Sequence, residues 1–285
     1  MGRTNAMSVA VIGAGNWGSS LIDALRQCGP GPSEVVGRNS WRRAKLDARV
    51  LWICVPDVAI AGVAEKIAAR RGSRLRGQLV VHSSGALSAS VLEPARHAGA
   101  RTAAVHPVMT FPTRAVVPLR GVMFGIEAGS AAMRRELLAL TRRVGGVPFT
   151  IQPDAKALYH AAGVLASPLL VSSITAAIET AQLAGLDAGT ATAWVRTLAE
   201  TTATNVFTRG PLRSFSGPFA RGDAEIIRLH LQALAAHPVL AEVYRSLAHH
   251  AVAALPVKNR RALKRALAEG HHLSPFKVKG TEIAR

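Results

Sequence analysis

The fold is decided by the stretch Val-Ala-Val-Ile-Gly-Ala-Gly-Asn-Trp-Gly at residues 9–18. A short apolar run meets the spacing G-x-G-x-x-G, and an amphipathic stretch follows at residues 21–25, so we expect a strand, a tight turn and a helix. In such a turn Gly13 bends the chain, Gly15 lets a diphosphate approach and Gly18 lets helix and strand pack closely. Backbone N–H groups at the helix start bind the phosphates. An ordinary glycine-rich turn is the alternative. The predicted cofactor-binding residues here are Gly13, Ala14, Gly15, Asn16, Trp17 and Gly18.

The end of the next predicted strand, residues 34–37, indicates which dinucleotide binds. An NAD site needs a carboxylate there for the ribose hydroxyls, whereas an NADP site needs a cation. The strand's only acid, Glu34, stands at its opposite end, and Arg38, Asn39 and Ser40 follow it. A guanidinium binds a phosphate through two parallel hydrogen bonds. We therefore predict NADP(H) as the cofactor, with a solvated arginine cluster as the alternative.

The composition of the 285 residues sets limits on partners and location. The formal charge is +18, but the cations are scattered, only 5% of residues are aromatic, and no nucleic-acid-binding signature is present. The pattern therefore argues against a nucleic-acid partner. Cys28 and Cys54 form no disulfide framework, so we expect a reduced, cytoplasmic setting. Residues 157–178 carry no charge at neutral pH, but their small and hydroxyl side chains favour a core or dimer helix over a membrane span.

Strand-like and helix-like stretches alternate through the first half of the chain. This alternation predicts an α/β fold, a Rossmann-type doubly wound and mainly parallel sheet. The segment 40–48 is too short for a full crossover helix, so we expect an abbreviated connection there. Beyond Pro153 the pattern becomes helical throughout. We predict a Rossmann NADP-binding domain over residues 1–152 and an all-α domain for substrate binding and dimerisation over residues 153–285.

Ligands bind such sheets at the carboxyl ends of the strands, so the turns that follow the strands are informative. The third strand is followed by Val55-Pro56-Asp57, whose backbone we expect beside the cofactor. The fourth is followed by His82-Ser83-Ser84-Gly85, and the fifth ends at His106. We expect Ser83 beside cofactor and substrate, and Ser84 and His106 beside the substrate. The alternative reading makes Ser84 a helix cap and His106 a polar strand end.

Lys156 and His160 open the helical region. Four residues apart, they share one helix face. A cation and an imidazole there can bind a substrate carboxylate and donate a proton to a carbonyl or imine that receives hydride. A snorkelling lysine beside a surface histidine is the alternative. Neighbouring pairs such as His249-His250 have no metal-ligand spacing, so no metal is expected.

Four strings carry a resemblance to a known family. They are H-S-S-G-A-L at residues 82–87, H-P-V-M-T-F at 106–111, K-A-L-Y-H-A-A at 156–162 and G-P-F-A-R-G-D at 217–223. Together they resemble the family that joins a Rossmann-like domain to a helical C-terminal domain of unknown function, DUF2520. That family is similar to pyrroline-5-carboxylate reductase, ketopantoate reductase and the 6-phosphogluconate dehydrogenase superfamily, which are hydride-transfer enzymes that prefer NADP and are often dimers.

The resemblance implies roles for several residues of the helical region. It makes Lys156 the proton-transfer lysine, with His160 where those enzymes tend to have asparagine. It places Ser167 at the substrate, although Pro168 stands where the family often has asparagine. It implies an NADP-dependent oxidoreductase that transfers hydride to a small carboxylate-bearing 2-oxo acid or imine, ketopantoate first and pyrroline-5-carboxylate next, and a homodimer joined through the helical domain. A non-catalytic dinucleotide-binding sensor is the alternative.

Overall fold

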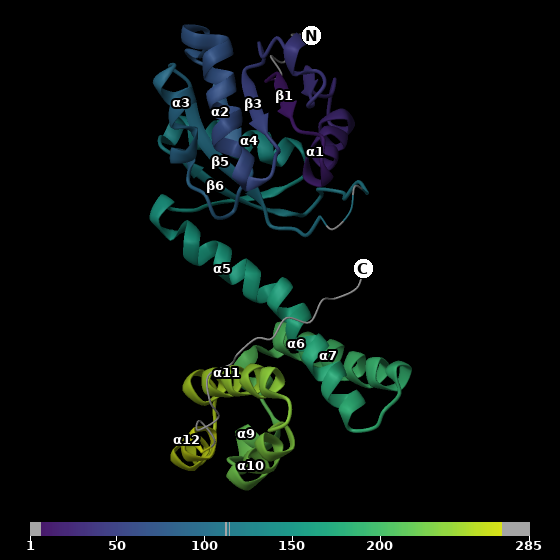
Figure 1. The fold of residues 1–285 in the computed structure, drawn as a ribbon. Helices are drawn as coiled ribbons and strands as arrows, with labels where there is room; N and C mark the ends of the chain where they lie inside the picture. Colours follow the sequence, from purple (N-terminus) through teal and green to yellow (C-terminus); the bar gives the residue numbers. More distant parts are fainter. Residues whose placement is uncertain (1–6, 112, 114, 270–285) are drawn as a thin grey trace. The chain divides into compact units, whose positions relative to one another are not determined.

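The protein is described by a computed structural model, which covers residues 7–111, 113 and 115–269. The chain divides into two compact units after Ser167 (Figure 1). The boundary that the sequence predicted, after residue 152, coincides with the end of the sheet and not with this division. The following helix α5 (Lys156–Ala166) belongs to the first unit because its side chains contact the ends of the strands.

The first unit is built on a seven-stranded sheet in the order β2-β1-β3-β4-β5-β6-β7. The first five strands in this order are parallel, β6 runs antiparallel to β5, and β7 is parallel to β6. This confirms the doubly wound, mainly parallel fold. The strand order reverses between β1 and β3, which is where such sheets bind ligands. The strands are β1 (Val9–Ile12), β2 (Glu34–Val36), β3 (Val50–Ile53), β4 (Leu79–His82), β5 (Arg101–Pro107), β6 (Met123–Ala128) and β7 (Val147–Thr150).

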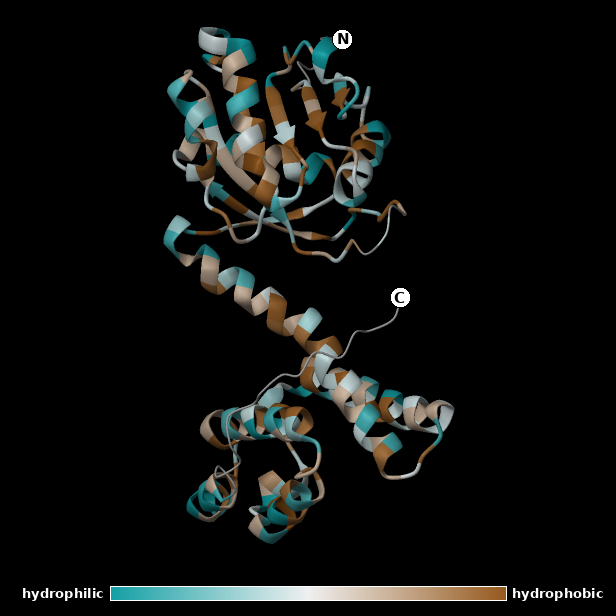
Figure 2. Ribbon diagram, viewed as in Figure 1, coloured by the Kyte–Doolittle hydropathy of each residue, from teal (hydrophilic) through white to brown (hydrophobic). Residues whose placement is uncertain are grey.

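Helices cover both faces of this sheet. The helices α1 (Asn16–Gln27) and α4 (Ala131–Arg143) pack on one face, and α2 (Asp57–Arg71) and α3 (Glu93–His97) pack on the other. Both faces of the sheet are therefore shielded from solvent. This explains why β1, β3 and β4 are buried along their whole length and apolar at nearly every position. Figure 2 shows β1 and β3 largely in the hydrophobic colour. Short 3-10 turns complete the unit at Trp41–Arg43, Gly72–Leu75, Ala89–Leu92 and Pro153–Ala155.

The connection from β2 to β3 is abbreviated, as the sequence predicts. It contains only the 3-10 turn Trp41–Arg43 and an extended stretch that buries Ala44, Leu46 and Ala48. The carboxylate of Glu34 accepts two backbone N–H groups of this stretch, at 2.8 and 2.9 Å. This acid therefore holds the connection in place, and it cannot serve as a ribose-binding carboxylate.

The second unit is helical. Its apolar core is small and lies among α10, α11 and α12. The helix α12 contributes the buried apolar stripe of Leu263, Ala266 and Leu267 to this core. The helices are α6 (Pro168–Leu183), α7 (Ala188–Arg209), α8 (Pro211–Ser214), α9 (Gly217–Arg221), α10 (Ala224–Ala233), α11 (Pro238–Ala254) and α12 (Arg260–Ala268).

The long apolar segment expected to form a core or dimer helix is broken at Ser167, whose φ and ψ are −130° and −86°. Pro168 disfavours the helical conformation in the residue before it and has no N–H for a helical hydrogen bond. By length and composition, residues 153–183 would suffice to cross a membrane, but a helix of a soluble protein can pass the same test. Within one chain α6 buries only Ala181, so of the two expected roles, core helix or dimer helix, the dimer helix stays a prediction.

Candidate functional site

The glycine-rich turn after β1 has the geometry predicted for a dinucleotide site. Gly13 has a φ of +104°, and a Cβ on it would collide with the carbonyl oxygen of Cys54. A Cβ on Gly18 would collide with the carbonyl oxygen of Gly13. By contrast, a Cβ on Gly15 would meet no atom within 4 Å. The turn is therefore closed against β3 on one side and open above Gly15, at the N-terminus of α1, where unpaired N–H groups bind anions.

The side chains of Asn16 and Trp17 connect this turn to its neighbours. The amide of Asn16 donates to the carbonyl of Phe111 at 2.8 Å, and the rings of Trp17 and Phe111 pack with centroids 5.3 Å apart. The indole N–H of Trp17 donates to Ser83 Oγ at 2.7 Å. These side chains thus hold the loop after β5 and the turn after β4 beside the dinucleotide turn.

The predicted ribose-phosphate contacts lie on an exposed turn after β2. Arg38, Asn39 and Ser40 are exposed, and Ser40 Oγ accepts the backbone N–H of Gly37 at 2.8 Å. No described residue forms a hydrogen bond or an ion pair with the guanidinium of Arg38. Its charge is therefore available to a phosphate, while Glu34, the acid of the same strand, binds the backbone of residues 45 and 46.

The turns after β3 and β4 bond mainly to the protein itself. Ser83 Oγ accepts the indole N–H groups of both Trp17 and Trp52, at 2.7 and 2.8 Å. Ser84 is buried; its hydroxyl donates to Asp57 Oδ2 at 2.6 Å and accepts two backbone N–H groups of its own turn. Both hydroxyls expected at substrate or cofactor therefore have protein partners. Val55, half-buried, and the exposed Pro56 lead into α2, and the roles predicted for these residues stay predictions.

His82 fixes the turn after β4 from below. It is fully buried, its Nε2–H donates to the carbonyl of Ser88 at 3.1 Å, and its Nδ1 accepts the N–H of Ser84 at 3.1 Å. Burial, reinforced by the charge of Lys156, lowers the pKa of His82 to about 4. The ring is therefore neutral near pH 7, with its proton on Nε2.

Lys156 is a buried cation at the start of α5, with only 2% of its side chain exposed. Its ammonium donates to the carbonyl of Ser84 at 3.0 Å and lies 3.6 Å from Glu127 Oε2 on β6. The other oxygen of Glu127 accepts the N–H of Ala89 at 2.9 Å. Burial lowers the pKa of Lys156, which the neighbouring carboxylate opposes. In this geometry the lysine braces the turn after β4, and its predicted catalytic role stays a prediction.

Two histidines and a tyrosine meet next to this turn. His106, at the end of β5, bonds through Nδ1 to the hydroxyl of Tyr159 at 2.6 Å, and its ring centroid lies 6.2 Å from that of His160. A Cβ on Gly85 would lie 2.7 Å from the His160 ring and 2.8 Å from the His106 ring. Gly85 therefore leaves room for both imidazoles. Lys156 and His160 contact the same turn from one helix face, as their spacing predicts.

The protonation states of this cluster follow from burial. Burial, with the charges of Lys156 and then His160, lowers the pKa of His106 to about 4, so its imidazole is neutral near pH 7. Burial raises the pKa of Tyr159 to about 12, so its hydroxyl keeps its proton. The cluster therefore offers one neutral hydroxyl and one neutral imidazole, both partly accessible.

Two family models match different parts of the chain. Residues 34–107 match the family described as a Rossmann-like domain, and residues 122–251 match the domain of unknown function DUF2520. The chain joins a Rossmann-like domain to a DUF2520 domain. His82 and His106 lie in the first match, and Glu127, Lys156 and Tyr159 lie in the second, so the cluster draws on both. No curated protein matches the chain significantly in sequence.

Solved structures share the fold of this chain at low sequence identity. A Bacteroides fragilis protein, provisionally named as an NADP oxidoreductase, has a TM-score of 0.67 at 21% identity, over 91% of this chain and 98% of its own. An imine reductase of Myxococcus stipitatus in complex with NADP+ has a TM-score of 0.63 at 18% identity, over 91% and 99%. A Plasmodium falciparum pyrroline carboxylate reductase with NADP bound has a TM-score of 0.54 at 14% identity, over 94% and 100%.

Two residues of the cluster, Glu127 and Tyr159, were not predicted from the sequence as site residues. Glu127 could have been noticed, because it is an acid within the otherwise apolar strand M-F-G-I-E-A. Tyr159 has no signal beyond its place between Lys156 and His160. Ser167, predicted at the substrate, lies seven residues past His160, which is about 10 Å along a helix. Within one chain the structure does not bring Ser167 to the cluster. No group of metal-ligating side chains occurs among the described residues.

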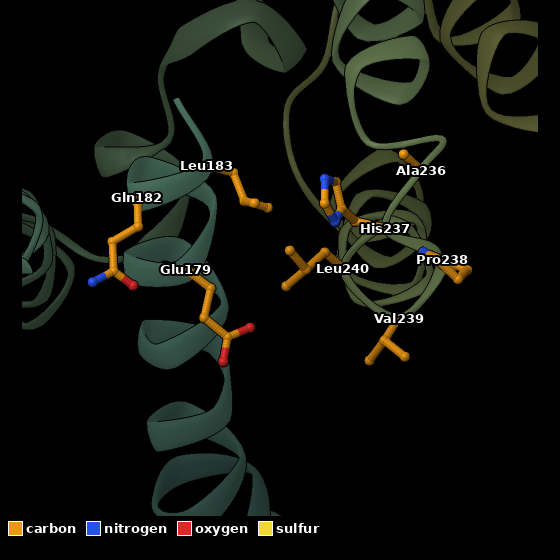
Figure 3. Close-up of a pocket in the computed structure, with 8 residues that line it drawn as sticks. All are labelled: Glu179, Gln182, Leu183, Ala236, His237, Pro238, Val239 and Leu240. Atoms are coloured by element: carbon orange, nitrogen blue, oxygen red, sulfur yellow. The ribbon is translucent and has the colours of Figure 1, made fainter. Parts of the chain in front are cut away.

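The second unit has a pocket of its own, of about 590 Å³, between the end of α6 and the start of α11. Leu183 and Leu240 face each other across it, with Glu179 and His237 at its edge (Figure 3). It contains none of the predicted site residues. Its mostly apolar lining is typical of a surface that another element covers.

Proposed function

We propose that this DUF2520 protein is an NADP-dependent oxidoreductase that reduces a small carboxylate-bearing 2-oxo acid or imine. One observation carries the proposal: a single turn connects the dinucleotide turn to the histidine–tyrosine cluster. Ser83 accepts the indole of Trp17 from the dinucleotide turn, and two residues later Gly85 lies under the rings of His106 and His160. A cofactor on the first turn therefore lies beside side chains with proton-transfer chemistry.

The residues of the dinucleotide turn fit NADP(H). The space above Gly15 and the N-terminus of α1 would receive the diphosphate, and Arg38 would receive the ribose phosphate. When bound, the reduced cofactor supplies the hydride. The chain's own part is to hold the substrate at the carboxyl ends of β4 and β5 and to provide a proton.

Two observations support this substrate class: the net positive charge of the protein and its similarity to solved reductase structures. An excess of cations gives the protein a field that favours anionic ligands. Several similar structures are imine reductases or pyrroline carboxylate reductases, which supports testing cyclic imines together with ketopantoate. Ketopantoate is the first 2-oxo acid to test, and pyrroline-5-carboxylate is the first imine.

Calorimetry with NADPH and NADH, followed by an NADPH-oxidation screen against 2-oxo acids and cyclic imines, tests this function. A matched pair of variants controls it. Gly15→Asp puts a carboxylate into the phosphate space, and Gly29→Asp makes the same change where a Cβ also meets no atom within 4 Å. We expect Gly15→Asp to abolish NADPH binding and Gly29→Asp to retain it. Failure of the wild type to bind either cofactor refutes the proposal; tight binding without any turnover supports a dinucleotide-binding sensor.

We also propose that the protein is a homodimer joined through α6 and α7. These two helices bury almost nothing within their own chain: Ala181 on α6, and Ala191 and Val195 on α7. Two helices cannot bury their apolar stripes alone, and a second copy of the same pair would complete a four-helix arrangement. Their exposed apolar side chains are Leu169, Leu170, Val171, Leu183, Trp194, Leu198 and Phe207.

Light scattering during size exclusion tests the dimer. We expect a dimeric mass for the wild type and a monomeric mass for Leu170→Asp. Val58→Asp, which changes an apolar residue that is 97% exposed on the first unit, should stay dimeric. A monomeric wild type would overturn the dimer proposal. A wild type that sediments with phosphatidylcholine vesicles would also overturn it, because that result supports a membrane-bound helix.

A further inference from the structure

We propose that the hydroxyl of Tyr159 donates the proton that completes the reduction, with His106 aligned behind it as its hydrogen-bond partner. This inference rests on the oxidoreductase function proposed above and adds the residue that acts as acid. It assigns a role to a side chain that the sequence analysis left without one.

The geometry around the hydroxyl leaves room for its hydrogen-bonded pair with His106. Tyr159 projects from the first turns of α5, and its hydroxyl lies 2.6 Å from His106 Nδ1. A Cβ on Gly125, in the neighbouring strand β6, would lie 2.9 Å from that hydroxyl, and a Cβ on Gly85 would press on the His106 ring. Two glycines therefore leave the room that the pair occupies. Tyr159 is only half-buried, so a substrate at the carboxyl end of β5 can contact it.

The direction of the hydrogen bond decides whether Tyr159 can act as an acid. The imidazole of His106 is neutral, so one of its nitrogens carries a proton and the other does not. If Nδ1 carries the proton, it donates to the phenol oxygen, and the phenol's own proton is free to point at a substrate. If Nε2 carries it, Nδ1 accepts the phenol proton and no acid remains. The proposal therefore requires the Nδ1–H form of His106.

The other candidate acids in the cluster are less suited to this task. The ammonium of Lys156 is 2% exposed and donates to the carbonyl of Ser84, so a substrate cannot reach it. The buried hydroxyl of Ser84 already donates its proton to Asp57 Oδ2. Ser83 Oγ accepts the indole N–H groups of Trp17 and Trp52, which hold it at the dinucleotide turn. His160 forms no hydrogen bond with any residue in the described part of the chain, so nothing orients its ring toward a substrate.

The step balances with one hydride and one proton. Hydride from the reduced cofactor adds to the carbon of the C=O or C=N bond, and the π electron pair of that bond moves onto oxygen or nitrogen. That atom takes the proton of Tyr159, which leaves a phenolate. The phenolate then takes a proton from solvent, while His106 keeps its proton on Nδ1 and continues to donate to the phenol oxygen. The sum is substrate, NADPH and one proton to reduced product and NADP+.

The chain provides a matched control for the phenol. It has two tyrosines, and each bonds to the Nδ1 of a histidine. Tyr244 bonds to His230 at 2.9 Å within the second unit. We expect Tyr159→Phe to lower kcat about 100- to 1,000-fold on the substrate found in the screen, the usual effect of removing a general acid. Tyr244→Phe should change kcat less than about twofold, and both variants should bind NADPH like the wild type.

A substrate that needs no proton separates proton donation from positioning. The N-methylpyrrolinium cation has a permanently charged C=N bond, so its reduction takes a hydride alone. Tyr159→Phe should reduce this cation within about fivefold of the wild type. An equal loss on both substrates would show that Tyr159 only positions the substrate, and no loss on either would also overturn the proposal.

A measurement without turnover tests the same idea. Nitrogen NMR of the histidines, with His106→Asn to assign the signal, should show the proton of His106 on Nδ1 in the wild type. A proton only on Nε2 would overturn the proposal. This result is independent of any substrate, so it still decides the inference should the wild type not reduce the cation. If the protein neither binds nor oxidises NADPH, the function fails instead, and the calorimetry described above reports that separately.

Discussion

Replacing Lys156 with methionine should destabilise the first unit strongly. The change removes the ammonium but keeps a side chain of similar length, so the main loss is the partner of Glu127. That carboxylate is 6% exposed, and its Oε2 has no hydrogen-bond partner apart from the ion pair with Lys156. Breaking a buried pair from one side costs about 3–5 kcal/mol, because an uncompensated charge remains in a medium of low polarity. We expect a loss of this size near pH 7.

The double variant Lys156→Met with Glu127→Leu is the matching control. Removing both charges leaves no buried ion, so the double variant should recover most of the stability and lie within about 1–2 kcal/mol of the wild type. Urea unfolding followed by tryptophan fluorescence measures both changes, because three of the four tryptophans, Trp17, Trp41 and Trp52, lie in the first unit. A single variant that loses less than about 1 kcal/mol would refute the argument that Lys156 compensates Glu127.

Three further predictions address the cofactor, the cluster and the pH dependence. Arg38→Ala should weaken NADPH binding about 10- to 100-fold and leave NADH binding unchanged, because a charge-assisted hydrogen bond to the ribose phosphate is lost; calorimetry measures both, and equal weakening would contradict the assignment. Gly85→Ala should lower kcat and leave NADPH affinity intact, since the added methyl would lie 2.7–2.8 Å from the rings of His106 and His160; unchanged turnover would show that the rings need not keep these positions. The folded protein keeps His82 and His106 neutral, because their pKa values are about 4 in the folded state and 6.5 in the unfolded state. The stability that these two histidines confer is therefore present above pH 6.5 and is lost as the pH falls to about 4. Thermal melts between pH 8 and 4 should show this loss, and a flat profile would contradict it.

The sequence predicted most of the first unit because local pattern and tertiary structure agree there. The spacing of the glycines is readable from sequence alone: Gly13 and Gly18 have direct steric reasons in the structure, and Gly15 leaves the space above the turn open. The abbreviated connection after β2 follows from simple length. The role of Glu34 was only partly predictable. Its position in the strand argued against a ribose contact, but its two backbone partners depend on how the connection after β2 folds back, which no local sequence pattern shows.

The candidate site was less predictable because its side chains compete for partners across distant strands. Lys156 has a clear sequence signal, yet its burial depends on Glu127, which the antiparallel pairing of β6 with β5 brings level with the end of β4. Ser83 and Ser84 stand at the predicted sheet edge, but the two indoles and one carboxylate that occupy them come from three other elements. Position along a strand is readable from sequence; the partner of a polar atom is not.

The burial of both tyrosines has a consequence for spectroscopy. Burial raises the pKa of each phenol to about 12. The chain therefore contains no phenol that ionises in its ordinary range while the fold is intact, and the ultraviolet signal of phenolate should stay silent until the solution is strongly alkaline. An absorbance step at milder alkalinity would then report that one unit has opened, and loss of the signal step in Tyr159→Phe or Tyr244→Phe would tell which unit opened first.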